Sequence, residues 1–341
     1  MPLKKNEIDL SKISDVPSII SKITKKAIHE GGSKLLDELK HDAPRILKEH
    51  QLIRRNFEKR LYDIWKKPLD LLGMFIVMSH ETGETFNKKF RPVAVKENDF
   101  IFEVLIRLHG RACLTAYEIH TLLRSGYASG AHARWRTLHE IAVTSHLIKM
   151  HDKELAERYL LHEIIESYKA LNELKTHERK LDTEPITQDE LDKLNKMRDE
   201  LCRKYGKPFS GNYGWASRVV NTNRKDGHGP SFVDIEKAVG LNHLRPYYRM
   251  ASHPTHANPK GIRFNLGIIS SKDLILSGPS NAGLADPGQN AAISLYHVNV
   301  ALLTSKPSIE NLIILNSMER LLEEIKLAFI EVHTNCFKTK D

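Results

Sequence analysis

The sequence predicts an all-α protein, an antiparallel helical bundle preceded by an N-terminal helical extension. Three observations support this class. Nearly every periodic segment places apolar residues three or four positions apart, which is the spacing of one helix face. Only RFNLGIIS, at 263–270, has the composition of a short strand, and strands do not alternate with helices along the chain. The 341 residues are 40% hydrophobic, enough for a substantial core.

The N-terminal extension is predicted to cover residues 1–95. A helical run at 32–65 carries leucines and isoleucines at helical spacing among charged residues. Pro68 and Gly73 are expected to interrupt it, because proline removes a helix hydrogen bond and glycine weakens a helix. A second helical run is expected to end near Pro92.

The helical core is predicted to cover residues 96–341. Asp99 is a suitable N-cap for a helix over about 100–124, and Gly126 separates that helix from the next one, over about 128–150. A highly charged segment near 175–210 is expected to form an exposed helical hairpin inserted into the core. The other helices are expected around 160–174 and near 232–239, 242–252, 288–305 and 307–335.

Composition narrows the class of partner. A net charge of +9 favours an anionic partner, of which nucleic acid is the commonest, although no block of five basic residues occurs. The three cysteines form no C-x-x-C pair, so we expect a reducing compartment and no cysteine metal site. The longest apolar run, 69–78, is too short to span a bilayer, and the first residues lack an export signal. We therefore expect a cytoplasmic protein without membrane contact and without a cofactor.

The 128–150 helix carries the first candidate site. At 100° per residue, His132, Arg136, His139 and Glu140 share one face. Arg134 precedes His139 by five positions and points elsewhere on a regular helix, so whether Arg134 or Arg136 is the working arginine stays open. The simplest alternative is that Arg136 and Glu140 form an ordinary ion pair between successive turns.

A second candidate site lies in YYRMASHPTHANPKG, at 247–261. Three of its residues, Tyr248, Ser252 and His256, are spaced by four, but Pro254 is expected to end the helix near Ser252. His256 is a candidate acid or base, while histidines that merely cap a helix end are the alternative. The residues expected to bind substrate are His132, Tyr248, Ser252, His253 and Lys260.

Four runs together resemble an uncharacterised bacterial family of helical proteins, a domain of unknown function. They are ARWRTLHEIAVTSHLI, ERYLLHEIIESYKAL, GNYGWA and YYRMASHPTHA, within roughly 100–260. The features they share with that family are an R-x-x-x-E helix (Arg136 and Glu140), a Y-x-x-x-S-x-x-x-H segment (Tyr248, Ser252 and His256) and a Gly-Trp-Ala element at 214–216.

That family is in turn similar to the HEPN superfamily, whose members are antiparallel helical bundles, often dimeric, and many of them RNA-cutting toxins or phage-defence effectors. The resemblance implies a HEPN-like core over 96–341. The superfamily signature is an arginine, usually a polar residue, and a histidine a few positions later. Here the match runs from Arg134 to His139, with Trp135 in the second position where a polar residue is usual.

Three functions follow as hypotheses. In a metal-independent ribonuclease, His139 or His256 would transfer protons, Arg136 or Arg134 would stabilise charge on the phosphate, and Glu140 would hold the arginine. Such a protein would bind RNA and act as a homodimer. The alternative is a non-catalytic helical module that binds nucleic acid or a partner protein from the same operon. A metal hydrolase built on histidines is third, because no H-E-x-x-H motif completes a metal site.

Overall fold

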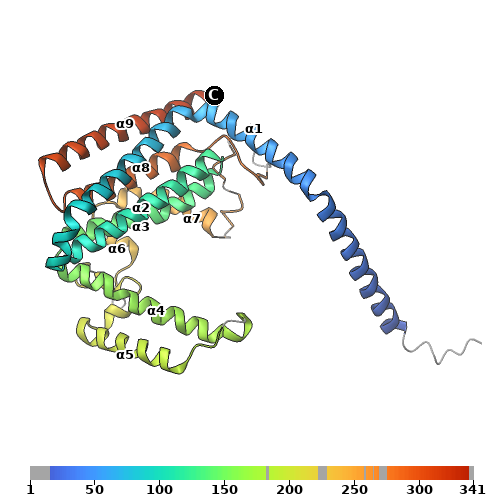
Figure 1. The fold of residues 1–341 in the computed structure, drawn as a ribbon, viewed down its shortest axis with the longest axis horizontal. Coiled ribbons are helices and arrows are strands. Elements are labelled where there is room, and N and C mark those ends of the chain that lie inside the picture. Colours follow the sequence, from blue (N-terminus) through green and yellow to red (C-terminus); the bar gives the residue numbers. More distant parts are fainter. Residues whose placement is uncertain are drawn as a thin grey trace, which may run out of the picture. The chain divides into compact units, whose positions relative to one another are not determined.

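The computed structural model describes residues 16–181, 184–221, 229–256, 259–263, 265–268 and 275–337. Within these ranges the chain forms helices and turns and no strand, which confirms the all-α class (Figure 1). The α-helices are α1 (Val16–Glu97), α2 (Phe100–Arg124), α3 (Ala128–Met150), α4 (Lys153–Leu181), α5 (Gln188–Tyr205), α6 (Phe232–Ala238), α7 (Arg245–Thr255), α8 (Ala285–Leu303) and α9 (Ile309–Phe337). Short 3₁₀ helices are η2 (Lys207–Ser210), η3 (Gly214–Ala216) and η4 (Asn242–Leu244).

The chain divides into two compact units, residues 1–60 and 61–341. The described part of the first unit is the N-terminal half of α1, whose large apolar side chains are exposed or half-exposed. The rest of α1 belongs to the second unit, where Leu61, Trp65 and Leu69 are completely buried. The boundary between the two compact units falls at residue 60, and residues 61–95 contribute to the core of the second unit.

Helix α1 is continuous through Pro68 and Gly73, so the predicted interruptions do not occur. Proline costs one backbone hydrogen bond, and burial of the residues around it offsets that loss. The Trp65 indole also donates to the carbonyl of Asn281 at 2.7 Å. At Gly73, the ring of His120 on α2 would lie 3.5 Å from an added Cβ, which is an ordinary packing distance.

The core of the second unit is formed by α2, α3 and α8, which pack against one another, with α9 on α8 (Figure 1). Asp99 caps α2 as predicted, accepting from the Phe102 amide at 3.0 Å. A buried chain of hydrogen bonds then ties three helices together. His109 on α2 contacts the Asn299 amide oxygen at 3.1 Å, and the Asn299 nitrogen donates to Ser79 of α1 at 2.9 Å.

The charged segment forms a helical hairpin in which α4 and α5 pack side by side (Figure 1). Thr187 begins α5 with a reciprocal capping arrangement, in which its hydroxyl accepts from the Glu190 amide and the Glu190 carboxylate accepts from the Thr187 amide. Along α5 only Leu191 is buried. The expectation of an exposed hairpin at this position therefore matches the structure.

Two local predictions need correction. Helix α7 continues to Thr255 and contains Pro254, so it does not end near Ser252. Pro254 lies in the last turn, where losing one amide costs little, and the amide of His256 still donates to the carbonyl of Ser252 at 3.2 Å. The second correction concerns 263–270, where no strand forms among the described residues. Residues 263, 266 and 267 lie in turns, 265 and 268 have no regular structure, and 264, 269 and 270 lie outside the described residues.

None of the helices in the described part of the chain is both long enough and apolar enough to cross a membrane.

Candidate functional site

Helix α3 positions the first group of predicted residues, and it is packed on nearly every side. Two of its three histidines, His132 and His139, have no exposed surface, whereas Arg136 and Glu140 are half-buried. The imidazoles of this predicted face therefore point into the protein. Only the two charged members of that face reach the surface.

Tyr248 joins the two candidate sites that the sequence predicts separately. Arg136 Nη2 donates to the Tyr248 hydroxyl at 2.9 Å, and that hydroxyl donates to Glu140 Oε1 at 2.5 Å. The Arg136 guanidinium also lies 4.6 Å from the centre of the Tyr248 ring. Burial and the hydrogen bond to Glu140 raise the pKa of Tyr248, so the phenol keeps its proton and bridges the two charges.

A second layer lies beneath this bridge. His139 Nε2 donates to Glu236 Oε1 at 2.8 Å, and both side chains are completely buried. Arg245 Nη1 donates to the other Glu236 oxygen at 2.6 Å, and its guanidinium stacks on the Tyr248 ring at 4.9 Å. We call the two layers together the polar cluster. Its members are Arg136, His139, Glu140, Glu236, Arg245 and Tyr248.

The polar cluster borders a hollow of about 160 Å³ between α2, α3, α4 and the loop segments before α6. Glu140 reaches this hollow, and Arg111 forms part of its wall. Burial, and the negative charge of Glu140, raise the pKa of Tyr213 to about 12, so this phenol is also protonated at neutral pH. The complete lining is Leu108, Arg111, Thr137, Glu140, Ile141, Thr144, Tyr159, Tyr213 and Phe232.

The other predicted site residues lie elsewhere. Arg134 forms an ion pair with Glu118 of α2, so it is committed to holding two helices together. The Ser252 hydroxyl donates to the Tyr248 carbonyl at 2.8 Å, a contact within α7. Among the residues near the end of α7, His253 is half-buried, while His256 and Lys260 are exposed.

Sequence reasoning missed the acidic centre of the polar cluster, Glu236, and its partner Arg245. A signal for Glu236 was present, because it follows Phe232 by four positions and Ile235 by one. That spacing puts a carboxylate on the apolar face of a short helix, where all three residues are buried. Arg245 has no comparable signal, since it lies at the start of α7 beside a proline.

The Gly-Trp-Ala element is held by a buried arginine of α4. Arg158 donates to the carbonyl of Trp215 at 3.1 Å and to the Ser217 hydroxyl at 3.0 Å. The ring of Tyr159 packs edge-on against Trp215. Two of the runs that carry the family resemblance therefore form one structural unit, and this unit supplies the Tyr213 wall of the hollow.

We expect Gly214→Ala to destabilise this unit. A Cβ on Gly214 would lie 2.1 Å from the carbonyl oxygen of Phe209, so the backbone must shift. The expected loss in the free energy of unfolding is about 1–3 kcal/mol, measured by urea denaturation. Gly110→Ala is the matched control, because nothing lies within 4 Å of its added Cβ. Equal midpoints for the two variants would contradict the clash.

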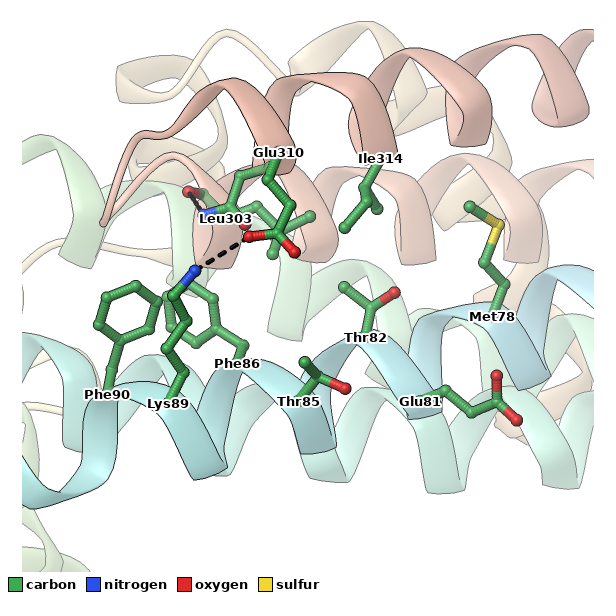
Figure 2. A pocket seen from close by; sticks show the side chains of 11 residues that line it. Met78, Glu81, Thr82, Thr85, Phe86, Lys89, Phe90, Leu303, Glu310 and Ile314 are labelled. Atoms are coloured by element: carbon green, nitrogen blue, oxygen red, sulfur yellow. Dashed lines mark hydrogen bonds and ion pairs between the residues drawn. The ribbon is translucent and has the colours of Figure 1, made fainter.

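A second hollow, of about 190 Å³, lies between α1 and the start of α9 (Figure 2). The Lys89 ammonium and the Glu310 carboxylate meet across it at 2.9 Å. Phe86, Phe90 and Ile314 supply apolar walls. None of the residues predicted for a site lines it, so the polar cluster stays the candidate functional site.

Histidine, cysteine and carboxylate side chains form no group of three or more that could hold a metal ion anywhere in the described ranges. The combination of His253, His256 and a histidine of α3, which a metal hydrolase would need, is therefore not assembled there.

Comparison with known proteins identifies the family. The model of DUF5677, a family of unknown function, matches residues 102–273, which is half of the chain. Neither the curated proteins nor the solved structures contain a match. The matched segment runs from the first turn of α2 beyond the end of α7 and includes the whole polar cluster. The chain therefore belongs to the DUF5677 family, an uncharacterised family whose domain contains this site.

Proposed function

We propose that this chain is a metal-independent ribonuclease with a HEPN-like core, acting as a toxin or phage-defence effector. The observation that carries the proposal is the Tyr248 bridge between Arg136 and Glu140 at the edge of the 160 Å³ hollow. A guanidinium, a carboxylate and protonated phenols next to a small aromatic hollow are groups that could bind an RNA nucleotide and transfer its protons.

The hollow is the proposed site for one unstacked base. Its volume suits a single flat ring system, and the rings of Tyr159, Tyr213 and Phe232 form part of its wall. Proteins that read single-stranded RNA stack bases on aromatic side chains and contact their polar edges. Thr137 and Thr144 supply hydroxyls for such edges. The net charge of +9 favours the RNA backbone in general.

The surface layer of the cluster supplies the proposed chemistry. Glu140 would take the proton of the ribose 2′-hydroxyl, whose oxygen attacks the neighbouring phosphorus. Arg136 would stabilise the negative charge that develops on the phosphate oxygens. Tyr213 holds its proton at neutral pH and would donate it to the departing 5′-oxygen. His139 has no exposed surface, so its role in this proposal is to position Tyr248 through the buried layer.

One observation favours the alternative, a non-catalytic helical module that binds RNA or a partner protein. His139 and Glu236 are completely buried, and the Tyr248 hydroxyl links Arg136 to Glu140. A network of this kind can serve only to fix the helices, with binding left to the surface around it.

A cleavage and binding assay with labelled single-stranded RNA in the presence of a chelator distinguishes the two. We expect the wild-type protein to cut, and Glu140→Gln to bind with similar affinity but to cut at least about 100-fold more slowly. Arg136→Ala should weaken RNA binding and also slow RNA cleavage. Arg107→Ala is the control, because Arg107 is an exposed arginine of α2 that pairs with Glu103 away from the cluster.

Each outcome has a defined meaning. Binding without cleavage, weakened by Arg136→Ala but not by Arg107→Ala, would support the binding module and reject the nuclease. Cleavage that survives Glu140→Gln would place the catalytic base elsewhere. Absence of RNA binding by the wild-type protein would reject RNA as the ligand.

A further inference from the structure

The N-terminal half of α1 carries an apolar stripe along one face of the helix. After Gly31 and Gly32, seven residues follow one another at intervals of three and four in turn. These intervals place them at the a and d positions of a heptad repeat. They are Leu36, Leu39, Ala43, Ile46, His50, Ile53 and Phe57. We call this set the heptad stripe.

No other described residue of the first unit, which the structure shows from residue 16 onward, covers the heptad stripe. Leu36 is 50% exposed, Leu39 is 52% exposed and Ile53 is 64% exposed. Helices in water obtain most of their stability from packing an apolar face and not from intrinsic propensity. A helix of this length with such a stripe therefore requires a surface that covers it.

We propose that the surface is a second copy of this chain, and that two copies form a parallel, in-register coiled coil through residues 36–57. The charged residues that flank the stripe favour the parallel orientation. Glu49 occupies a g position and Arg54 the e position five residues later. In a parallel dimer these two positions meet across the interface, so Glu49 of each copy faces Arg54 of the other.

An antiparallel pairing would bring like charges together. That arrangement places e positions opposite e positions and g positions opposite g positions. When Ile53 of one copy lies opposite Ala43 of the other, Lys40 faces Arg54 and Glu49 faces Glu49. When the alignment is shifted by one heptad, Glu49 faces Asp42. Each such pair is repulsive, whereas the parallel arrangement has two attractive Glu49–Arg54 pairs.

Two residues that look unfavourable for a coiled coil fit this assignment. Pro44 occupies a b position, on the outer side of the helix, and α1 is continuous through it. His50 is the single polar residue at an a position. A lone polar side chain in the seam reduces stability but fixes the register, because a shifted alignment would bury it against apolar residues.

The first experiment compares two neighbouring residues in the full chain. Leu52 and Ile53 are similarly exposed, at 60% and 64%, but only Ile53 lies in the heptad stripe. Light scattering coupled to gel filtration at one micromolar concentration should give a dimer for the wild type and for Leu52→Lys, and a monomer for Ile53→Lys. Circular dichroism checks that the core of each variant is folded.

Three results would overturn the proposal: a monomeric wild type, a dimer that survives Ile53→Lys, or a monomer in both variants. The orientation has its own test. In a Cys202→Ser, Cys336→Ser background, Ile53→Cys should oxidise to a covalent dimer, because d positions of parallel helices meet. Leu52→Cys should not. In an antiparallel pair Ile53 faces Ala43, so a cross-link that forms only with Ile53→Cys and Ala43→Cys mixed would overturn the parallel assignment.

Discussion

Replacing Glu236 with alanine should lower the free energy of unfolding by about 3–5 kcal/mol. The Glu236 carboxylate has no exposed surface and accepts hydrogen bonds from both His139 and Arg245. Removing it leaves the guanidinium of Arg245, which is three-quarters buried, without its acceptor. Truncating one partner of a buried charge pair costs more than the pair contributes, because the remaining charge has lost its solvation and its counterion.

Urea denaturation followed by circular dichroism measures this effect. Glu324→Ala is the matched control, because Glu324 is an exposed glutamate of α9 and its loss should change stability by only some tenths of a kcal/mol. Glu236→Gln keeps the side-chain volume but turns one acceptor oxygen into a donor that faces another donor. Its stability should therefore lie between those of Glu236→Ala and Glu324→Ala. Indistinguishable midpoints for Glu236→Ala and Glu324→Ala would show that the buried layer does not hold the helices.

The sequence predicted the elements whose ends carry local signals. Helices α2 and α3 were expected at about 100–124 and 128–150, where the structure has them. Asp99 caps the first, and Gly126, at a φ of 79°, allows the left-handed turn that separates the two. Such signals act within a few residues, so they can be read without knowing the tertiary structure.

Features decided by packing could not be read in this way. Pro68 does not end α1, because burial of Leu69 and its neighbours offsets the lost hydrogen bond. A helical projection groups His139 with Glu140 on one face, but it contains no information about what covers that face. Glu236 comes from a helix nearly a hundred residues away, and the hydrogen bond that it accepts from His139 is buried.

Buried histidines should make the folded state sensitive to mild acid. Burial lowers the pKa of both His109 and His132 to about 4, from an ordinary value of 6.5. Between pH 6.5 and 4 the unfolded chain therefore binds a proton at each position that the folded chain does not. These two positions cost no stability above pH 6.5. As the pH drops from 6.5 to 4, each histidine lowers the free energy of unfolding by roughly 3 kcal/mol.

His132→Leu should remove one of these two contributions without destabilising the protein at neutral pH. Neither ring nitrogen of His132 has a hydrogen-bond partner among the described residues, so leucine leaves nothing unpaired and spares the burial of two polar atoms. His109→Leu is the matched comparison, because it removes the same titration but leaves the amide oxygen of Asn299 without its contact.

Urea midpoints at pH 7 and pH 4.5 should therefore show a smaller acid loss in both variants and a lower stability at pH 7 in His109→Leu alone. An acid loss in His132→Leu as large as in the wild type would mean that His132 takes up its proton in the folded state.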